Sequence, residues 1–191
     1  TTSEKTQQYL LQTHGRFPLT IVRGSGTKVW DDRGREYLDF CAGIATCSIG
    51  HCHPALSKAI ADQAQTLMHC SNLYAGDNQA DLAELLVEGI IGEPGKVFFS
   101  NSGAEANDGL IKLARRFGAE SERHEIITFS KGFHGRTIGA MSATAQGKIH
   151  GGFGPLFPGF VYSDFNDLAA AKAAITDKTA AFLVEPIQGE G

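Results

Sequence analysis

The sequence predicts an α/β protein whose sheet is mainly parallel, preceded by a separate antiparallel N-terminal lobe. From about residue 97 onward, short apolar segments of strand type alternate with helical segments, which is typical of a parallel sheet covered on both faces. Before residue 50, three short strand-like runs are joined by glycine-containing turns, as in an antiparallel meander. The chain has 191 residues, 42% of them hydrophobic, and is therefore long enough to bury a core.

The N-terminal lobe is predicted to span residues 1–50. Ser3 is a suitable cap for a short helix that runs to about Gln12. Strands are then expected at 20–23, 28–31 and 36–40, with turns at 24–26 and 32–34. Because this meander differs in pattern from everything that follows, we treat residues 51–191 as part of a second, larger α/β domain.

Helices come first in the larger domain, and strands and helices then alternate. Pro54 in a first turn indicates a helix through about Met68, and Asp77 can cap another. Strands are expected at Val97–Phe99, Glu125–Phe129, Phe160–Tyr162 and Ala180–Val184. Helices are expected at about 103–117, 137–145 and 167–175.

Charge and cysteine content exclude several classes of partner. The net charge is −4 and the basic residues are scattered, so we expect no nucleic-acid partner. No apolar run approaches the length of a membrane span, and no signal peptide is recognisable. The four cysteines form no CxxC pair, which favours free thiols in a reducing compartment. Cys47, His51, Cys52 and His53 match no familiar zinc pattern, so we expect no metal there but a loop that caps the next helix.

A candidate anion site lies at the start of the helix expected at 103–117. Ser102, Gly103 and Ala104 are small residues at a helix N-terminus, where backbone N–H groups are free and the helix dipole adds positive charge. A phosphate group suits this position. The alternative is a small-residue turn that only packs helix on strand, and a Walker-type loop is excluded because its Gly-Lys-Ser/Thr ending is absent.

A second group of candidates follows the strand expected at Glu125–Phe129, at the sheet edge where open α/β proteins bind ligands. Phe133 could pack against a planar cofactor held at Gly103, or it could simply fill the loop. Arg136 offers a planar guanidinium that matches a substrate carboxylate. His134 could be an acid or base, although a hydrogen-bonded structural imidazole is the simpler interpretation.

The last strand runs into two acidic residues. Glu185 ends that strand at the ligand edge, and Glu190 lies between two glycines on a segment that can bend. A carboxylate there could bind a cationic amine or pair with an arginine. The alternative is a pair of solvated surface acids.

Together these stretches resemble the class III pyridoxal-phosphate aminotransferases of fold type I, closest to the acetylornithine and ornithine branch. The resemblance covers essentially the whole chain. Besides the segments described above, it rests on Gly15-Arg16-Phe17-Pro18, Tyr37-Leu38-Asp39-Phe40, Gly50-His51-Cys52-His53-Pro54 and Ser71-Asn72-Leu73-Tyr74.

The resemblance implies a cofactor and a role for each candidate. Ser102, Gly103 and Ala104 would hold the phosphate of pyridoxal 5'-phosphate, and Phe133 would stack on its ring. Arg136 would bind the substrate α-carboxylate, and Glu190 would gate the site by pairing with an arginine elsewhere in the enzyme. The family also implies a homodimer with active sites at the interface, near the segment Ser71–Tyr74.

Two departures from the family pattern bear on function. Ala75 stands where this branch often has a second tyrosine, and the chain is about half the usual length. None of its nine lysines has the context of the Schiff-base lysine. We therefore expect no catalytic lysine in this chain, an incomplete large domain, no small C-terminal domain, and no activity of the chain alone.

The function implied is transfer of an amino group from N-acetylornithine to 2-oxoglutarate, in arginine biosynthesis. Ornithine, succinylornithine and 4-aminobutyrate stay open as donors, and the alternative from another class is a non-catalytic domain that binds a phosphate-bearing ligand. The compartment implied is a bacterial cytoplasm, or an organelle matrix or stroma after removal of a transit peptide.

Overall fold

The computed structural model describes residues 1–190, so that Gly191, the last residue of the predicted motif, lies outside the described residues. The chain divides into two compact units, of which the first is Thr1–Ala80 and the second begins at Asp81. This division into compact units does not test the predicted domains, 1–50 and 51–191. That domain division stays a prediction.

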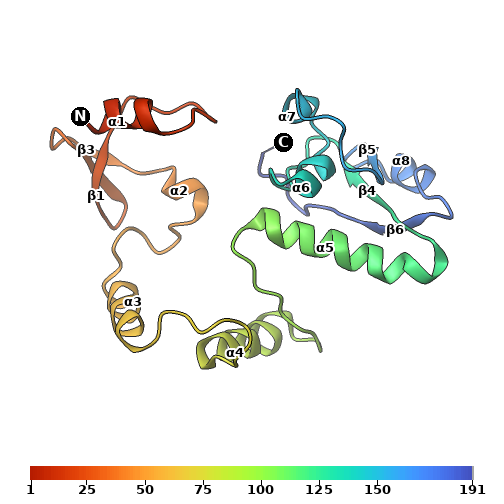
Figure 1. Cartoon of the computed structure of the whole chain (residues 1–191), viewed down its shortest axis with the longest axis horizontal. Helices are drawn as coiled ribbons and strands as arrows, with labels where there is room; N and C mark the ends of the chain where they lie inside the picture. The colour runs from red at the N-terminus through yellow and green to blue at the C-terminus, as the bar shows by residue number, and fades with distance from the viewer. Residues whose placement is uncertain (191) are drawn as a thin grey trace. The chain divides into compact units, whose positions relative to one another are not determined.

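The first unit contains a short helix and an antiparallel sheet (Figure 1). Helix α1 (Thr2–Tyr9) is capped by Thr1, whose hydroxyl accepts the Glu4 N–H while Glu4 reaches back to the N-terminal amine. This capping box starts the helix earlier than the predicted Ser3 cap, which was wrong. The remaining elements are β1 (Ile21–Ser25), β2 (Lys28–Asp31), β3 (Glu36–Leu38), α2 (Ala42–Ala45), α3 (Pro54–Thr66) and α4 (Asp77–Glu84), which runs into the second unit.

The antiparallel meander is confirmed, with strand order β1-β2-β3. Asp31, at the end of β2, is only 2% exposed and organises the turn that follows. Its carboxylate accepts hydrogen bonds from the backbone of Arg33 and Arg35, from the Arg35 side chain at 2.7 Å and from the Tyr37 hydroxyl at 3.0 Å. Burial alone would raise the pKa of Asp31, but these donors outweigh it and lower the pKa to about 2.

The stability of this turn therefore depends on the ionisation of the Asp31 carboxylate at acid pH. Because its pKa in the folded chain lies below the ordinary value of 3.8, its contribution to stability is present above pH 4. That contribution is lost as the pH falls from 4 towards 2. Trp30, the single tryptophan, neighbours Asp31 and packs under Arg23, so its fluorescence reports on this sheet.

We expect Asp31→Asn to unfold the meander at neutral pH more readily than the wild type and to remove most of the acid transition between pH 4 and 2. The matched control is Asp32→Asn, at the exposed neighbouring position. Urea titrations followed by Trp30 fluorescence at several pH values measure both effects. Equal acid profiles for the Asp31→Asn variant and the wild type would contradict the assignment.

His51 has a structural role in the first unit. Its Nε2 atom lies 2.6 Å from Asp39 Oδ2, and its backbone exchanges hydrogen bonds with Gly26. The ring packs on Gly24, where an added Cβ would lie 2.7 Å from the imidazole. Within residues 1–190, no cluster of three or more His, Cys, Asp or Glu side chains has the geometry of a metal site.

The second unit is built on a parallel sheet, as predicted, and this sheet has three strands in the order β5-β4-β6. The three strands are β4 (Glu125–Phe129), β5 (Phe160–Ser163) and β6 (Thr179–Phe182). The helices are η1 (Leu85–Ile91), α5 (Gly103–Gly118), η2 (Ala119–Ser121), α6 (Ile138–Ala143), α7 (Gly147–His150) and α8 (Leu168–Ala173). Among the described residues, no helix is both long and apolar enough to cross a membrane.

The core of this unit lies between α5 and the sheet. Ile126 of β4 is buried against Ile111 of α5 and Ala143 of α6. The next residue of β4, Ile127, is also fully buried, although successive strand residues point to opposite faces. The central strand is therefore covered on both faces, which explains its continuous apolar sequence.

The strand predicted at Val97–Phe99 was wrong, because this segment has no strand structure. A strand requires a neighbour to complete its hydrogen-bond ladder, and among the described residues the parallel sheet contains only β5, β4 and β6. Phe98 is 71% exposed, yet its ring contacts α5 at Gly109, where an added Cβ would lie 2.9 Å from it.

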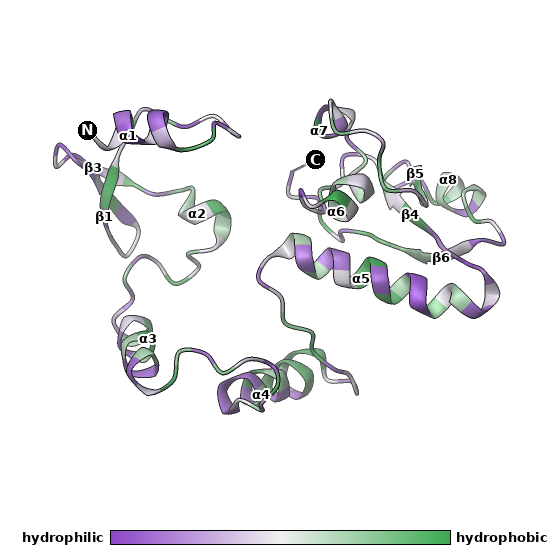
Figure 2. Ribbon diagram, viewed as in Figure 1, coloured by the Kyte–Doolittle hydropathy of each residue, from purple (hydrophilic) through white to green (hydrophobic). Residues whose placement is uncertain are grey.

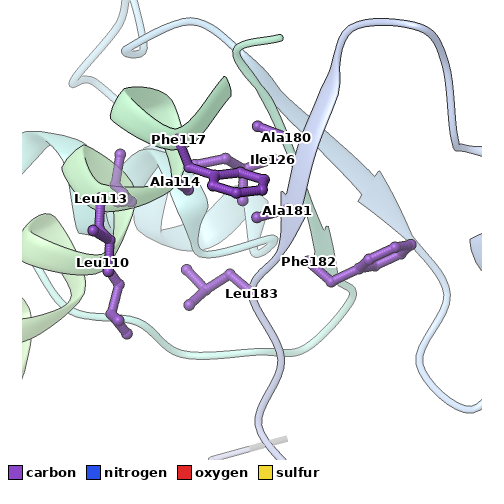
Figure 3. A pocket seen from close by; sticks show the side chains of 10 residues that line it. Leu110, Leu113, Ala114, Phe117, Ile126, Ala180, Ala181, Phe182 and Leu183 are labelled. Atoms are coloured by element: carbon purple, nitrogen blue, oxygen red, sulfur yellow. The ribbon is translucent and has the colours of Figure 1, made fainter. Parts of the chain in front are cut away.

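An apolar groove of about 450 Å³ runs between α5 and β6 (Figure 3). Helix α5 is amphipathic, with hydrophilic and hydrophobic residues alternating along its length (Figure 2). Leu110, Leu113 and Phe117 line the helix side of the groove, and the residues from Ala180 to Leu183 line the strand side. β6 is an edge strand, so apolar side chains and unpaired backbone groups lie together on this flank.

We expect the 191-residue chain to self-associate through this flank at micromolar concentrations. Leu113→Lys should shift the assemblies towards monomer, because it places a charge on a side chain that is 66% exposed in the groove. Leu168→Lys on α8 is the matched control, since Leu168 is 69% exposed outside the groove. Sedimentation velocity over a concentration series checks this. Equal effects of the two substitutions would contradict it.

Candidate active site

The candidate site lies in the second unit, where the start of α5 meets the loop that follows β4. Helix α5 is 16 residues long and is capped by Ser102, whose Oγ accepts the Glu105 N–H at 3.2 Å. The Glu105 carboxylate turns back to accept the N–H and side-chain amide of Asn101 at 2.7 and 2.9 Å. The helix start is thus fixed by its own residues, which leaves the N–H groups of Gly103 and Ala104 without an intrahelical acceptor.

The loop from Ser130 to Arg136 packs directly on this helix start. Gly135 has φ of +127°, and an added Cβ there would lie 2.6 Å from the Ala104 Cβ. Asn107, one turn further along α5, donates its side-chain amide to the His134 carbonyl at 2.7 Å. The structure therefore brings the predicted phosphate cradle and the predicted ring-packing loop together.

Several backbone groups of this loop are hydrogen-bonded by side chains from other segments. Gln146 donates to the carbonyls of Lys131 and Gly132 at 3.2 and 3.0 Å. Gln188, after β6, donates to the Ser130 carbonyl at 2.9 Å. Thr144 Oγ1 accepts the His134 N–H at 2.9 Å. Since backbone groups of a partly buried loop must be satisfied, these contacts define its conformation.

Glu185 completes this set of contacts from the segment that follows β6. Its Oε2 atom accepts the Phe133 N–H at 2.9 Å, across 52 residues of sequence. His134 is only 4% exposed. Burial lowers the pKa of His134 below its ordinary value of 6.5, and the nearby Glu185 carboxylate partly opposes that shift. Burial thus favours the neutral form of the imidazole, which fits a structural role.

The six candidate residues differ in how firmly they are held. Ala104 and Phe133 are half-buried and belong to the assembled helix start and loop. Ser102 and Gly103 are exposed at the start of α5. Arg136 and Glu190 are both exposed, and within residues 1–190 neither takes part in an ion pair. Their roles, like the ring contact of Phe133, stay predictions.

The loop partners were not identified from the sequence as functional residues. They are Asn107, Thr144, Gln146 and Gln188. Each contributes through one or two side-chain hydrogen bonds to backbone groups ten or more residues away, which leaves no local motif. Gln188 alone had a signal, since it lies in the predicted segment between Glu185 and Glu190.

The residues at the helix start fit a phosphate group. A Cβ added at Gly103 would meet no protein atom within 4 Å, so the space beside this backbone is open. The N–H groups of the first helical turn and the positive end of the helix dipole face that end of α5. The same helix end packs on the loop that carries Phe133, which could cover one face of a ring attached to the phosphate.

The chain belongs to the class-III aminotransferases, since residues 9–191 match the sequence model of that family. These are pyridoxal-phosphate-dependent transferases, and the predicted resemblance and fold class are confirmed. The acetylornithine aminotransferase of Caldanaerobacter subterraneus is 53% identical over 188 residues, which cover 97% of the chain and 47% of that enzyme. The Gloeobacter violaceus acetylornithine aminotransferase is 50% identical, with 100% and 48% covered.

Solved structures support the same family. The ornithine aminotransferase of Toxoplasma gondii superposes with a TM-score of 0.90 at 34% identity, covering 98% of the chain and 45% of that protein. The omega transaminase of Pseudomonas jessenii in complex with PMP superposes with a TM-score of 0.89 at 28% identity, covering 99% and 49%. The chain spans about half the length of the relatives it matches.

Substitutions at two glycines of the site distinguish the contribution of packing from that of anion binding. We expect Gly135→Ala to lower the melting temperature, because its Cβ would collide with Ala104 at a positive φ. Gly103→Ala should leave the melting temperature unchanged or slightly higher, because a helical glycine costs up to about 1 kcal/mol relative to alanine. It should nevertheless weaken pyridoxal phosphate binding, because the methyl group fills the open space. Thermal unfolding and cofactor titration measure both; unchanged cofactor affinity in Gly103→Ala would contradict the cradle.

Proposed function

We propose that this chain forms the cofactor-phosphate and substrate-carboxylate part of an acetylornithine aminotransferase. The observation that supports the proposal is the packing of the loop 130–136 against the start of α5, where Gly135 lies against Ala104 and Asn107 bonds the His134 carbonyl. Identity of about 50% to several acetylornithine aminotransferases supports the choice of N-acetylornithine as donor. We propose 2-oxoglutarate as acceptor and arginine biosynthesis as the pathway.

Each site residue then has a defined task. Ser102, Gly103 and Ala104 hold the phosphate of the cofactor through backbone N–H groups and the helix dipole. Phe133 covers one face of the ring. When bound, pyridoxal phosphate supplies the electron sink that the amino-group transfer requires, while the protein supplies orientation and charge.

Substrate recognition falls to two exposed charged residues in the same unit. Arg136 binds the α-carboxylate that the amino-acid donor and the oxo-acid acceptor share, because its planar guanidinium matches a carboxylate in a bidentate pair. Glu190 pairs with an arginine from another part of the enzyme and so admits one substrate or the other. An exposed Arg136 is ready to accept a carboxylate without first breaking an internal ion pair.

The remaining parts of the catalytic apparatus are proposed to come from elsewhere in the enzyme. The coverage of 47% of the Caldanaerobacter relative supports the interpretation that this chain is one part of such a polypeptide. The Schiff-base lysine and the small domain would then belong to the other part. A homodimer with its sites at the interface, in a bacterial cytoplasm or an organelle matrix or stroma, completes the proposal.

Ornithine is the second candidate donor. The ornithine aminotransferase of Toxoplasma gondii, which superposes with a TM-score of 0.90 at 34% identity, supports this alternative. The two donors share the α-carboxylate and the distal amino group that is transferred, and they differ at the α-nitrogen, which is charged in ornithine and acylated in N-acetylornithine. Comparing kcat/KM for the two donors in the complete enzyme decides between them. Failure with both would leave succinylornithine and 4-aminobutyrate as donors, or the non-catalytic phosphate-binding domain.

The test of the substrate site is Arg136→Lys in the complete enzyme. We expect kcat/KM to fall for both the amino donor and the oxo acid, because losing a bidentate partner of a buried carboxylate costs about 2–5 kcal/mol. Arg116→Lys, at an exposed position near the end of α5, is the control. Stopped-flow measurement of each half-reaction reports the two substrates separately. Unchanged values for both would assign Arg136 a purely structural role.

A further inference from the structure

Glu185 differs in charge from the other side chains that hydrogen-bond the loop 130–136. The other side chains that bond the loop backbone are neutral amides and a hydroxyl, namely Asn107, Thr144, Gln146 and Gln188. Among the described residues, Glu185 is the one charged side chain that hydrogen-bonds this backbone. Hydrogen bonds with an ionised partner are roughly twice as strong as neutral ones.

The position of the Glu185 carboxylate is itself tightly defined. An added Cβ at Gly132 would lie 3.1 Å from its Oε2 atom and 3.4 Å from His134 Nε2. Gly132 is buried and Glu185 is half-buried, so little water competes for the carboxylate. The loop therefore closes around this oxygen, and a larger residue at Gly132 would displace it.

The amide that Glu185 binds belongs to the residue on which the cofactor site depends. Phe133 carries the ring proposed to cover the cofactor, and its N–H is held at 2.9 Å by Glu185. On the other side of Phe133, the His134 N–H and carbonyl are held by Thr144 and Asn107. The backbone on which the Phe133 ring is mounted is thus fixed on both sides.

We propose that Glu185 is a positioning residue: its carboxylate holds the Phe133 amide and so orients the Phe133 ring and the following Arg136 towards the cofactor and substrate. Glu185 acts through the loop and does not touch the reacting atoms. This inference rests on the proposed function, which assigns Phe133 and Arg136 their ligands. The contact itself is independent of that function, and this independence allows separate tests.

The first experiment measures the contact without any cofactor. Backbone hydrogen exchange is followed in the wild type, Glu185→Gln and Glu185→Ala, using the 191-residue chain, or the complete enzyme if the chain alone associates. Glu185→Gln keeps the shape and an acceptor oxygen but removes the charge, whereas Glu185→Ala removes both. Glu120→Gln, at an exposed carboxylate in η2, is the control.

We expect exchange at the Phe133 amide to accelerate about tenfold in Glu185→Gln and more in Glu185→Ala. The amides of Ile126 and Ile127 in β4 should keep their wild-type rates. An unchanged rate at Phe133 would overturn the proposal. Uniform acceleration across the sheet would also overturn it, because it would show that Glu185 merely stabilises the fold.

The second experiment measures the consequence for ligands in the complete enzyme. We expect Glu185→Gln to raise the dissociation constant for pyridoxal phosphate and the KM for the amino donor about tenfold, with a smaller change in kcat. Glu120→Gln should change neither. Local acceleration at Phe133 with wild-type ligand constants would refute the positioning role. If the wild-type enzyme binds no pyridoxal phosphate, the proposed function fails, while the exchange experiment still decides whether Glu185 holds the loop.

Discussion

The constraint on which this site depends is that the backbone groups of the loop 130–136 must find hydrogen-bond partners where water is largely excluded. The partners come from segments distant in sequence: Asn107 is 27 residues from His134, and Gln188 is 58 residues from Ser130. The loop therefore takes its conformation only when the parallel sheet has brought these segments to one edge. Formation of the sheet and formation of the site are therefore coupled.

This arrangement also separates the charges of the site. Glu185 would repel an anion if its carboxylate were free, yet its Oε2 atom is bonded to the Phe133 N–H and faces the interior of the loop. The positive end of the α5 dipole stays open at Gly103, where small side chains leave the backbone accessible. The negative charge of Glu185 thus stabilises the loop, while the positive end of the α5 dipole remains accessible to a ligand.

Local signals explain which features could be predicted from the sequence. Strand β4 and helix α5 carry strong apolar periodicity and appear close to their predicted bounds, and the cap and small residues at Ser102 lie in one short segment. The strand at Val97–Phe99 failed because a strand also depends on a neighbouring strand, which periodicity cannot show. The roles of Glu185 and Asn107 were missed for the same reason, since each depends on one contact across the fold.

In the second unit, the polar loop contacts are largely made within the chain, whereas part of the apolar surface remains uncovered. Several backbone groups of the loop 130–136 are hydrogen-bonded by side chains of this chain. In contrast, Leu110, Leu113 and Phe117 of α5 leave an apolar groove beside the edge strand β6. Hydrogen bonds are directional and define a geometry, while apolar burial is not directional and mainly supplies stability. Additional chain packed along β6 would therefore add stability to a site geometry that residues of this chain already define. The geometry of the proposed cofactor site and the stability of the unit that carries it therefore depend on different kinds of interaction.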